Sequence, residues 1–251
     1  MSWVNPNIDK MRKYTKQLAI LTIVILAFFL RINKITEVPP SLNWDEVSIG
    51  YNAYSILKTG KDEWGVNFPL FFKSYGEYKL PVQIYASIPA IAMFGLNDFG
   101  IRVTPVVYGT LTILLMFFLG KALFKNDFIA ILAALLLAVS PWHLQLTRAS
   151  FESSFALFWV VLGAWLLIKG FKNHKFWIWS MIPFAISTFT YNTARIFTPL
   201  FIFLILVIYF RDFIKDKKTT LTFEVLSLFT PQEQELYKKK FLEAAKRTGE
   251  V

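Results

Sequence analysis

Long apolar segments alternate with short polar ones along this chain, which is the pattern of a protein that crosses a membrane several times. The first apolar segment covers residues 18–30. The later ones cover roughly residues 101–120, 128–146, 153–169, 176–190 and 196–210. Because a helix needs about 20 apolar residues to cross a bilayer, the pattern predicts about six spans. The expected fold class is all-α, a polytopic transmembrane helix bundle.

A further apolar segment, residues 80–96, is expected to be re-entrant or interfacial. It is short for a span, and Pro81 and Pro89 interrupt it. If it does not cross, every lysine-rich loop falls on the cytoplasmic side, as the positive-inside rule requires, whereas a crossing would turn these loops outward. These loops lie at residues 121–125, 169–175 and 211–218.

The ends of the chain suggest its location and its division into parts. A basic stretch precedes the first span and no cleavage site follows it, which predicts an uncleaved signal anchor in the cell membrane with a cytoplasmic N-terminus. Residues 1–218 would form the membrane module, with an outer loop over residues 36–80. Residues 219–251 would form a short soluble cytoplasmic tail, helical because Thr230 and Glu233 have capping-box spacing.

Composition agrees with a membrane protein and excludes other classes. The chain is 55% hydrophobic and 18% aromatic, more than the core of a soluble domain needs. Its formal net charge of +10 reflects basic loops, and its aromatic residues lie inside spans, so no nucleic-acid partner is expected. The absence of cysteine excludes disulfides and thiolate metal sites.

The predicted topology gathers polar side chains on the outer side of the membrane. Ionisable groups are costly near a bilayer, so their convergence is a hypothesis for a functional site. The alternative is that the arginines merely extend to the lipid headgroups. The gathered residues are Asp45, Glu46, Lys79, Arg102, His143, Arg148, Glu152, Tyr191 and Arg195.

The acidic pair Asp45 and Glu46 is expected to open a helix in the outer loop. Asn43 is a favourable N-cap, Glu46 is placed to complete a capping box, and Gly60 would end the helix. Acidic residues in a first turn are favoured by the helix dipole and need no catalytic purpose. A carboxylate beside a cluster of cations could instead act as a general base on a hydroxyl. Local spacing leaves both interpretations open.

The other candidates also have two interpretations. Lys79 could meet a phosphate or anchor a helix end at the interface. Arg148 and Glu152 are four residues apart and would form an ion pair on one helix face. Tyr191 and Arg195 lie in a polar turn between two spans. His143 has no partner at metal-ligand spacing, and we expect it at the interface.

Several short motifs occur in an order that resembles a known family. They are the acidic pair, GEYKLP at 76–81, FGLNDFGIR at 94–102, SPWH at 140–143 and RASFE at 148–152. With them the chain resembles the N-terminal half of a GT-C type glycosyltransferase, in the branch of protein O-mannosyltransferases and aminoarabinose transferases. The resemblance covers residues 10–218.

This resemblance implies a function. Such enzymes pass a sugar from a polyprenyl-phosphate donor to a hydroxyl of a protein, lipid or glycan on the outer side of the membrane. By matching position, Asp45 would be the catalytic carboxylate, with Glu46 its neighbour in positioning or binding. Lys79 would contact the donor phosphate, although Leu80 replaces the first of the family's two prolines. Arg102 and Glu152 match an arginine and a second acidic residue.

The remaining expectations concern cofactors, partners and alternatives. Arg148, Tyr191 and Arg195 are further candidates for donor binding. No cofactor is firmly implied, although the two outer carboxylates leave a divalent metal open. Relatives continue with further spans, so a partner chain could supply a missing C-terminal half. The competing functions are a noncatalytic membrane subunit and a lipid or sugar transporter, which would place ionisable residues near the bilayer midplane.

Overall fold

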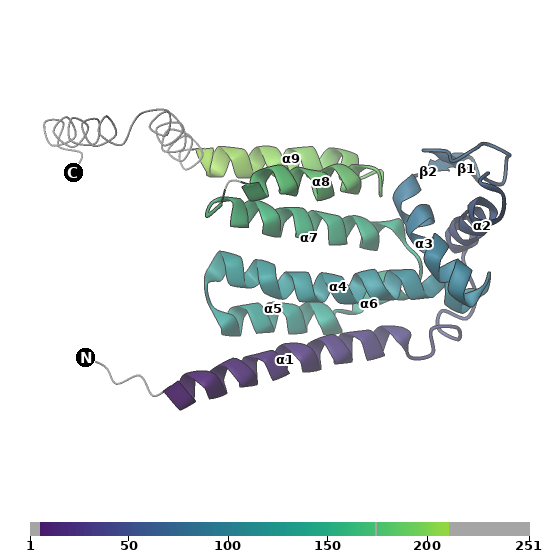
Figure 1. Ribbon diagram of the computed structural model, residues 1–251. Coiled ribbons are helices and arrows are strands. Elements are labelled where there is room, and N and C mark those ends of the chain that lie inside the picture. The colour runs from purple at the N-terminus through teal and green to yellow at the C-terminus, as the bar shows by residue number, and fades with distance from the viewer. Residues whose placement is uncertain (1–5, 174, 211–251) are drawn as a thin grey trace, which may run out of the picture. The chain divides into compact units, whose positions relative to one another are not determined.

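The computed structural model describes residues 6–173 and 175–210, and this part of the chain is mostly helical (Figure 1). The chain forms two compact units, residues 1–200 and 201–251, and the bundle and site below belong to the first. The helices are α1 (Pro6–Ile32), α2 (Trp44–Thr59), α3 (Pro81–Phe94), α4 (Asp98–Phe124), α5 (Asp127–Val139), α6 (Pro141–Arg148), α7 (Glu152–Gly170), α8 (Lys175–Thr188) and α9 (Ala194–Ile208). The predicted helical fold class is confirmed.

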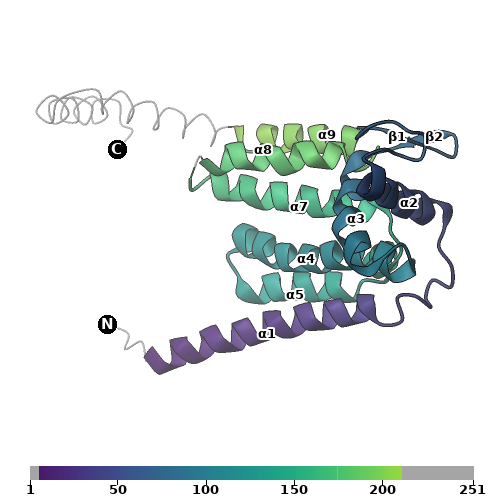
Figure 2. The same cartoon turned by 45° about the vertical axis from the view of Figure 1, so that its right-hand side comes forward.

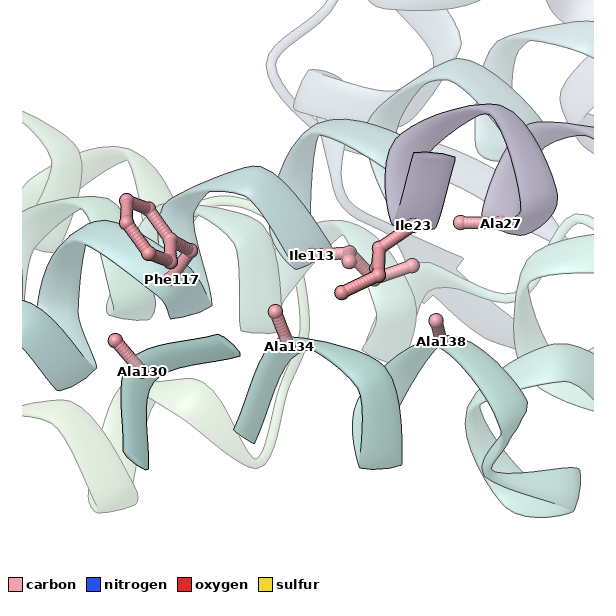
Figure 3. Packing of buried hydrophobic residues seen from close by; sticks show 7 residues of the cluster. All are labelled: Ile23, Ala27, Ile113, Phe117, Ala130, Ala134 and Ala138. Atoms are coloured by element: carbon pink, nitrogen blue, oxygen red, sulfur yellow. The ribbon is translucent and has the colours of Figure 1, made fainter. Parts of the chain in front are cut away.

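The long helices pack side by side, and several of the packed pairs are distant along the chain. Helix α4 packs against α5 and α7, α7 against α8, and α1 against α4 and α5. Figure 3 shows why α1, α4 and α5 approach closely: Ala130, Ala134 and Ala138 recur every fourth residue on one face of α5. Such small side chains let helix backbones come together within a membrane, where packing rather than water exclusion drives association.

One end of the bundle carries α2, α3 and a hairpin, and we refer to it as the α2 end (Figures 1 and 2). The predicted capping box at the start of α2 is present, and Gly60 ends the helix with a φ of 71°. The hairpin joins β1 (Phe72–Ser74) to β2 (Glu77–Lys79) in antiparallel register. Its two-residue turn places Tyr75 and Gly76 at positive φ, as a tight hairpin turn requires. The sequence analysis did not predict these strands.

Buried apolar residues fasten this end to the bundle. Ile49 and Ala53 of α2, Phe72 of β1, Ile84 of α3 and Ile101 of α4 belong to one hydrophobic cluster. This cluster holds the N-terminal turns of α2, α3 and α4 together, so polar residues in those turns become neighbours.

Three helical segments in the described residues are long and apolar enough to cross a bilayer, namely Lys13–Ile32, α4 and α7. A fourth crossing exists if α5 and α6, which meet at an angle of 56°, form one broken span. Pro141 at the start of α6 explains the break, because proline has no N–H to continue the helix. The apolar pattern over residues 128–146 had predicted a single span.

Helix α3 lies at the α2 end in both views of the fold (Figures 1 and 2). It begins at Pro81 and contains Pro89, and it packs against α2 and α4. The six-span count, the orientation and the domain boundaries stay predictions, and the tail over residues 219–251 lies outside the described residues.

Cysteine labelling in sealed membrane vesicles would test the predicted orientation. The chain has no cysteine of its own, so a single exposed substitution gives an unambiguous signal. We expect Lys61→Cys to react with an impermeant maleimide from the outer side, and Leu123→Cys and Lys172→Cys to react only after permeabilisation. Labelling of Leu123→Cys from the outer side would overturn the predicted orientation.

Candidate active site

A buried ion pair joins the start of α2 to the start of α4. The Arg102 Nε donates to Glu46 Oε1 at 2.8 Å, and its Nη2 donates to Glu46 Oε2 at 3.1 Å. The two side chains are 0% and 1% exposed. Glu46 also accepts from the backbone N–H groups of Asn43 and Ser150. The carboxylate is therefore saturated by groups from three parts of the chain.

The remaining N–H groups of Arg102 donate hydrogen bonds to the loop before α2. Its guanidinium donates to the carbonyl oxygens of Ile35, Pro39 and Ser41 at 2.8–2.9 Å. A guanidinium has five N–H groups, and with the Glu46 contacts all five are used. In this conformation Arg102 has no N–H left for a phosphate, so the geometry favours a positioning role over the expected donor contact.

Asp45 and Lys79 form the second ion pair at the α2 end. The Lys79 Nζ lies 2.6 Å from Asp45 Oδ1, and it also pairs with Glu77, which the sequence analysis missed. The Lys79 side chain is 6% exposed and the Asp45 side chain 26% exposed. Burial alone would lower the pKa of Lys79, but its hydrogen bonds to Asp45 and Glu77 outweigh burial and raise that pKa above its ordinary value. Lys79 therefore stays a cation at neutral pH.

Asp45 has a solvent-accessible carboxylate with a free oxygen. Its Oδ1 faces Lys79, whereas its Oδ2 makes no hydrogen bond within the described ranges 6–173 and 175–210. The residue occupies the second position of α2, directly before Glu46, whose capping box and ion pair fix that turn. Two adjacent carboxylates thus differ in kind: Glu46 is locked in the interior, and Asp45 is open to a reactant.

Glu152 begins α7 beside the Asp45–Lys79 pair. It interacts electrostatically with Lys79, Asp45 and Glu77, and its carboxylate contacts the backbone of Leu80. Its Oε1 is buried and has no hydrogen-bond partner among the described residues. The fold therefore brings Glu152 close to Asp45 and Lys79.

Arg148 does not pair with Glu152, contrary to the expectation from their spacing. Helix α6 ends at Arg148 and α7 begins at Glu152, so the two residues do not share one helix face. Instead, the Arg148 guanidinium donates to the carbonyl oxygens of Leu30 and Val38 at 2.8 and 2.9 Å. Arg148 thus ties α6 to the chain that leads from α1 to α2.

Arg195 contacts the α2 end through Phe71, but neither Arg195 nor Tyr191 joins the ion pairs of the described residues. The Arg195 guanidinium lies over the ring of Phe71, 5.6 Å from its centroid, just before β1. The backbone N–H of Val82 donates to the carbonyl of Phe189, which links α3 to the end of α8. Arg195 is exposed and Tyr191 half-buried, and within the described part of the chain neither pairs with Asp45, Glu77 or Glu152.

His143 is buried within the protein, against Arg31. Its Nδ1 lies 2.7 Å from Arg31 Nη2, and its ring is 4% exposed, whereas Trp142 is 78% exposed. Arg31 also donates to the carbonyl of Ala138, which the break before Pro141 leaves without a helical partner. Arg31 therefore braces the kink between α5 and α6, a role that its position at the end of a span did not reveal.

The described residues contain no group of three or more histidine or acidic side chains arranged to hold a metal ion. Asp45 and Glu77 are paired with the Lys79 ammonium instead, and Glu152 interacts electrostatically with it.

Comparison with known proteins places this chain in a family. Residues 81–232 match the family described as dolichyl-phosphate-mannose-protein mannosyltransferase. The chain is also similar to dolichyl-phosphooligosaccharide-protein glycotransferase 2 of Pyrococcus furiosus, with 26% identity over 147 residues. That alignment covers 57% of the chain and 19% of the relative, so the chain matches about a fifth of the relative's length. No solved structure matches the chain. The family match begins after Lys79 and therefore leaves Asp45 untested.

Proposed function

Because the chain belongs to the dolichyl-phosphate-mannose-protein mannosyltransferase family of glycosyltransferases, we propose that it moves a sugar from a polyprenyl-phosphate donor to a hydroxyl acceptor on the extracytoplasmic side of the membrane. The observation that carries this proposal is the Asp45–Lys79 pair. It supplies one accessible carboxylate and one buried cation, 2.6 Å apart, at the end of a helix bundle.

The pair can perform the two tasks that the transfer needs. The acceptor oxygen forms a bond to the anomeric carbon of the sugar, and the bond between that carbon and the phosphate oxygen breaks. Asp45 takes the proton of the acceptor hydroxyl as general base. Lys79 stabilises the negative charge on the departing phosphate, and its low exposure strengthens this interaction because little water screens it.

The residues around the Asp45–Lys79 pair position it and modulate its contacts. Glu46 and Arg102 fix the first turn of α2, which orients Asp45, and they do not need to touch the substrate. Glu77 pairs with Lys79 from the exposed side of the hairpin, so the donor phosphate competes with Glu77 for the ammonium. Arg195, which lies over the ring of Phe71, and Tyr191 stay candidates for binding the donor or the acceptor.

The location of the ionisable residues bears on the alternative functions. A transporter would place such residues near the bilayer midplane, whereas Asp45, Glu46, Lys79, Arg102 and Glu152 lie in or beside the first turns of α2, α3, α4 and α7. A noncatalytic subunit would need neither the free Asp45 oxygen nor a buried lysine beside it. Because the chain matches only a fifth of its relative, a partner chain could still be required for turnover.

Substitution of Lys79 would test the phosphate contact. In reconstituted vesicles supplied with radiolabelled dolichyl phosphate mannose, we expect Lys79→Met to raise the donor KM about tenfold or more, because a charge-assisted hydrogen bond is worth roughly 1.5–3 kcal/mol. The measurement is the release of dolichyl phosphate as a function of donor concentration.

The matched control for this experiment is Lys61→Met, which removes an exposed lysine from the same loop and should leave the KM unchanged. An unaltered donor KM together with an unaltered kcat in Lys79→Met would contradict the phosphate contact. If the native chain releases no dolichyl phosphate until the C-terminal portion of a relative is coexpressed, the split-enzyme alternative is favoured.

A further inference from the structure

Gln83 is fully buried in the first turn of α3 and holds an unused hydrogen-bond acceptor. Its Nε2 donates to the carbonyl oxygen of Ser150 at 2.9 Å and to the Ser150 Oγ at 2.6 Å. A carbonyl oxygen can only accept, so the amide nitrogen has to face Ser150 and the orientation of the amide is set. Gln83 Oε1 is then directed elsewhere, and it has no partner in the described residues.

Glu152 provides a second unused acceptor in the same region. Its Oε1 is also buried and unpartnered in the described part of the chain. Glu152 lies two residues after Ser150, which Gln83 holds, and its carboxylate contacts the backbone of Leu80 at the start of α3. Both oxygens therefore lie where α3 begins and residues 149–151 connect α6 to α7.

Two buried acceptors without donors are costly, which indicates that another molecule satisfies them. Their chemistry selects that molecule. Acceptors bind O–H or N–H groups, whereas the phosphodiester of a lipid-linked sugar carries only acceptors. A phosphate oxygen therefore cannot satisfy Gln83 Oε1, and it has Lys79 as its partner instead.

We propose that Gln83 and Glu152 form a subsite that binds the hydroxyl groups of the donor sugar. The inference rests on the proposed function, because the sugar is bonded directly to the phosphate that Lys79 would hold. Glu152 interacts electrostatically with both Lys79 and Asp45, so a sugar attached to that phosphate lies between the base and the two acceptors. Recognition of the donor would then have two parts: Lys79 binds the phosphate, and the oxygens of Gln83 and Glu152 accept hydrogen bonds from the sugar hydroxyl groups.

Two lipids that differ only in the sugar would test this assignment on the reconstituted full chain. Dolichyl phosphate mannose carries phosphate and sugar, and dolichyl methyl phosphate carries the same phosphodiester without the sugar. We expect Gln83→Met to weaken binding of dolichyl phosphate mannose about tenfold, the effect of losing one buried hydrogen bond. Binding of dolichyl methyl phosphate should not change.

Ser150→Ala separates a binding role of Gln83 from a structural one. This variant removes one hydrogen bond that Gln83 donates but keeps Gln83 Oε1. Two alternatives are that Gln83 only holds Ser150 in place, or that an enclosed water binds the Gln83 and Glu152 oxygens. Both alternatives predict that Gln83→Met has no selective effect on binding of the sugar-bearing lipid. The subsite predicts that Ser150→Ala retains the native preference and Gln83→Met loses it.

The other possible results of these binding measurements also support or contradict the subsite. An unchanged ratio of the two affinities in Gln83→Met, or an equal loss of preference in Ser150→Ala, would overturn the subsite alone. If Gln83→Met does not fold, the affinities of the native chain for the two lipids still test the subsite. Equal affinity for both lipids contradicts recognition of the sugar. A native chain that binds neither lipid overturns the proposed function and the subsite together.

Discussion

Replacement of Asp45 by asparagine is expected to reduce sugar transfer by about 10²–10⁴-fold, the range of general base catalysis. Asparagine keeps the shape of the side chain but cannot accept the proton of the acceptor hydroxyl. The measurement is the turnover of dolichyl phosphate mannose at saturating donor and acceptor in reconstituted vesicles. Donor affinity should change far less than turnover, because Lys79 remains in place and gains freedom from its carboxylate partner.

Asp98→Asn is the matched control for this variant. Asp98 also lies in the first turn of a helix at the α2 end, and in the described residues it pairs with no cation. Both substitutions lose a favourable interaction with a helix dipole, worth about 0.3–1 kcal/mol. Only Asp45→Asn should lose turnover. If its turnover equals that of the unmodified chain, Asp45 is not the base. If turnover falls equally in both variants, the effect comes from the helix ends.

Substitution of Arg102 by methionine is expected to destabilise the fold by about 3–5 kcal/mol, the cost of breaking a buried ion pair. The change leaves the Glu46 carboxylate buried without its cation and frees three carbonyl oxygens of the loop before α2. Adding Glu46→Gln should restore part of the lost stability, because the double variant no longer buries an unpaired charge. Thermal unfolding in detergent would measure both effects.

Arg148→Met provides the comparison for Arg102. Arg148 also donates to backbone carbonyl groups, but it is only partly buried and holds no carboxylate in the described residues. Its removal should therefore cost much less than removal of Arg102. Equal losses in the two variants, or no recovery in the double variant, would show that the Glu46 charge is not what makes Arg102 important.

Local patterns predicted the elements of this protein well. Asn43, Glu46 and Gly60 are close in sequence, and the helix they were expected to bound is the one observed. The long apolar segments correspond to helices because their composition requires internally satisfied backbones in a membrane. The hairpin at Tyr75 and Gly76 was missed because its strands are only three residues each, too short for an alternating pattern to indicate a strand.

The assignment of roles to the site residues depended on contacts that no spacing reveals. Glu46 and Arg102 are 56 residues apart, and Gln83 and Ser150 are 67 apart. For Arg148 and Glu152, spacing predicted a contact that does not form. Their helical spacing predicted an ion pair, but α6 ends at Arg148 and α7 begins at Glu152. Spacing indicates a contact only where both residues belong to one continuous element.

The sequence by itself determined that the chain is a helical membrane protein with acidic residues at the start of α2, because apolar content, caps and turn residues act within a few positions. Tertiary structure alone decided which of two adjacent carboxylates is locked and which is open. That distinction arises from packing: the hydrophobic cluster around Ile49 and Ile101 brings Arg102 beneath Glu46 and leaves Asp45 facing Lys79. Burial and charge pairing across the fold, rather than residue type, separate the two roles.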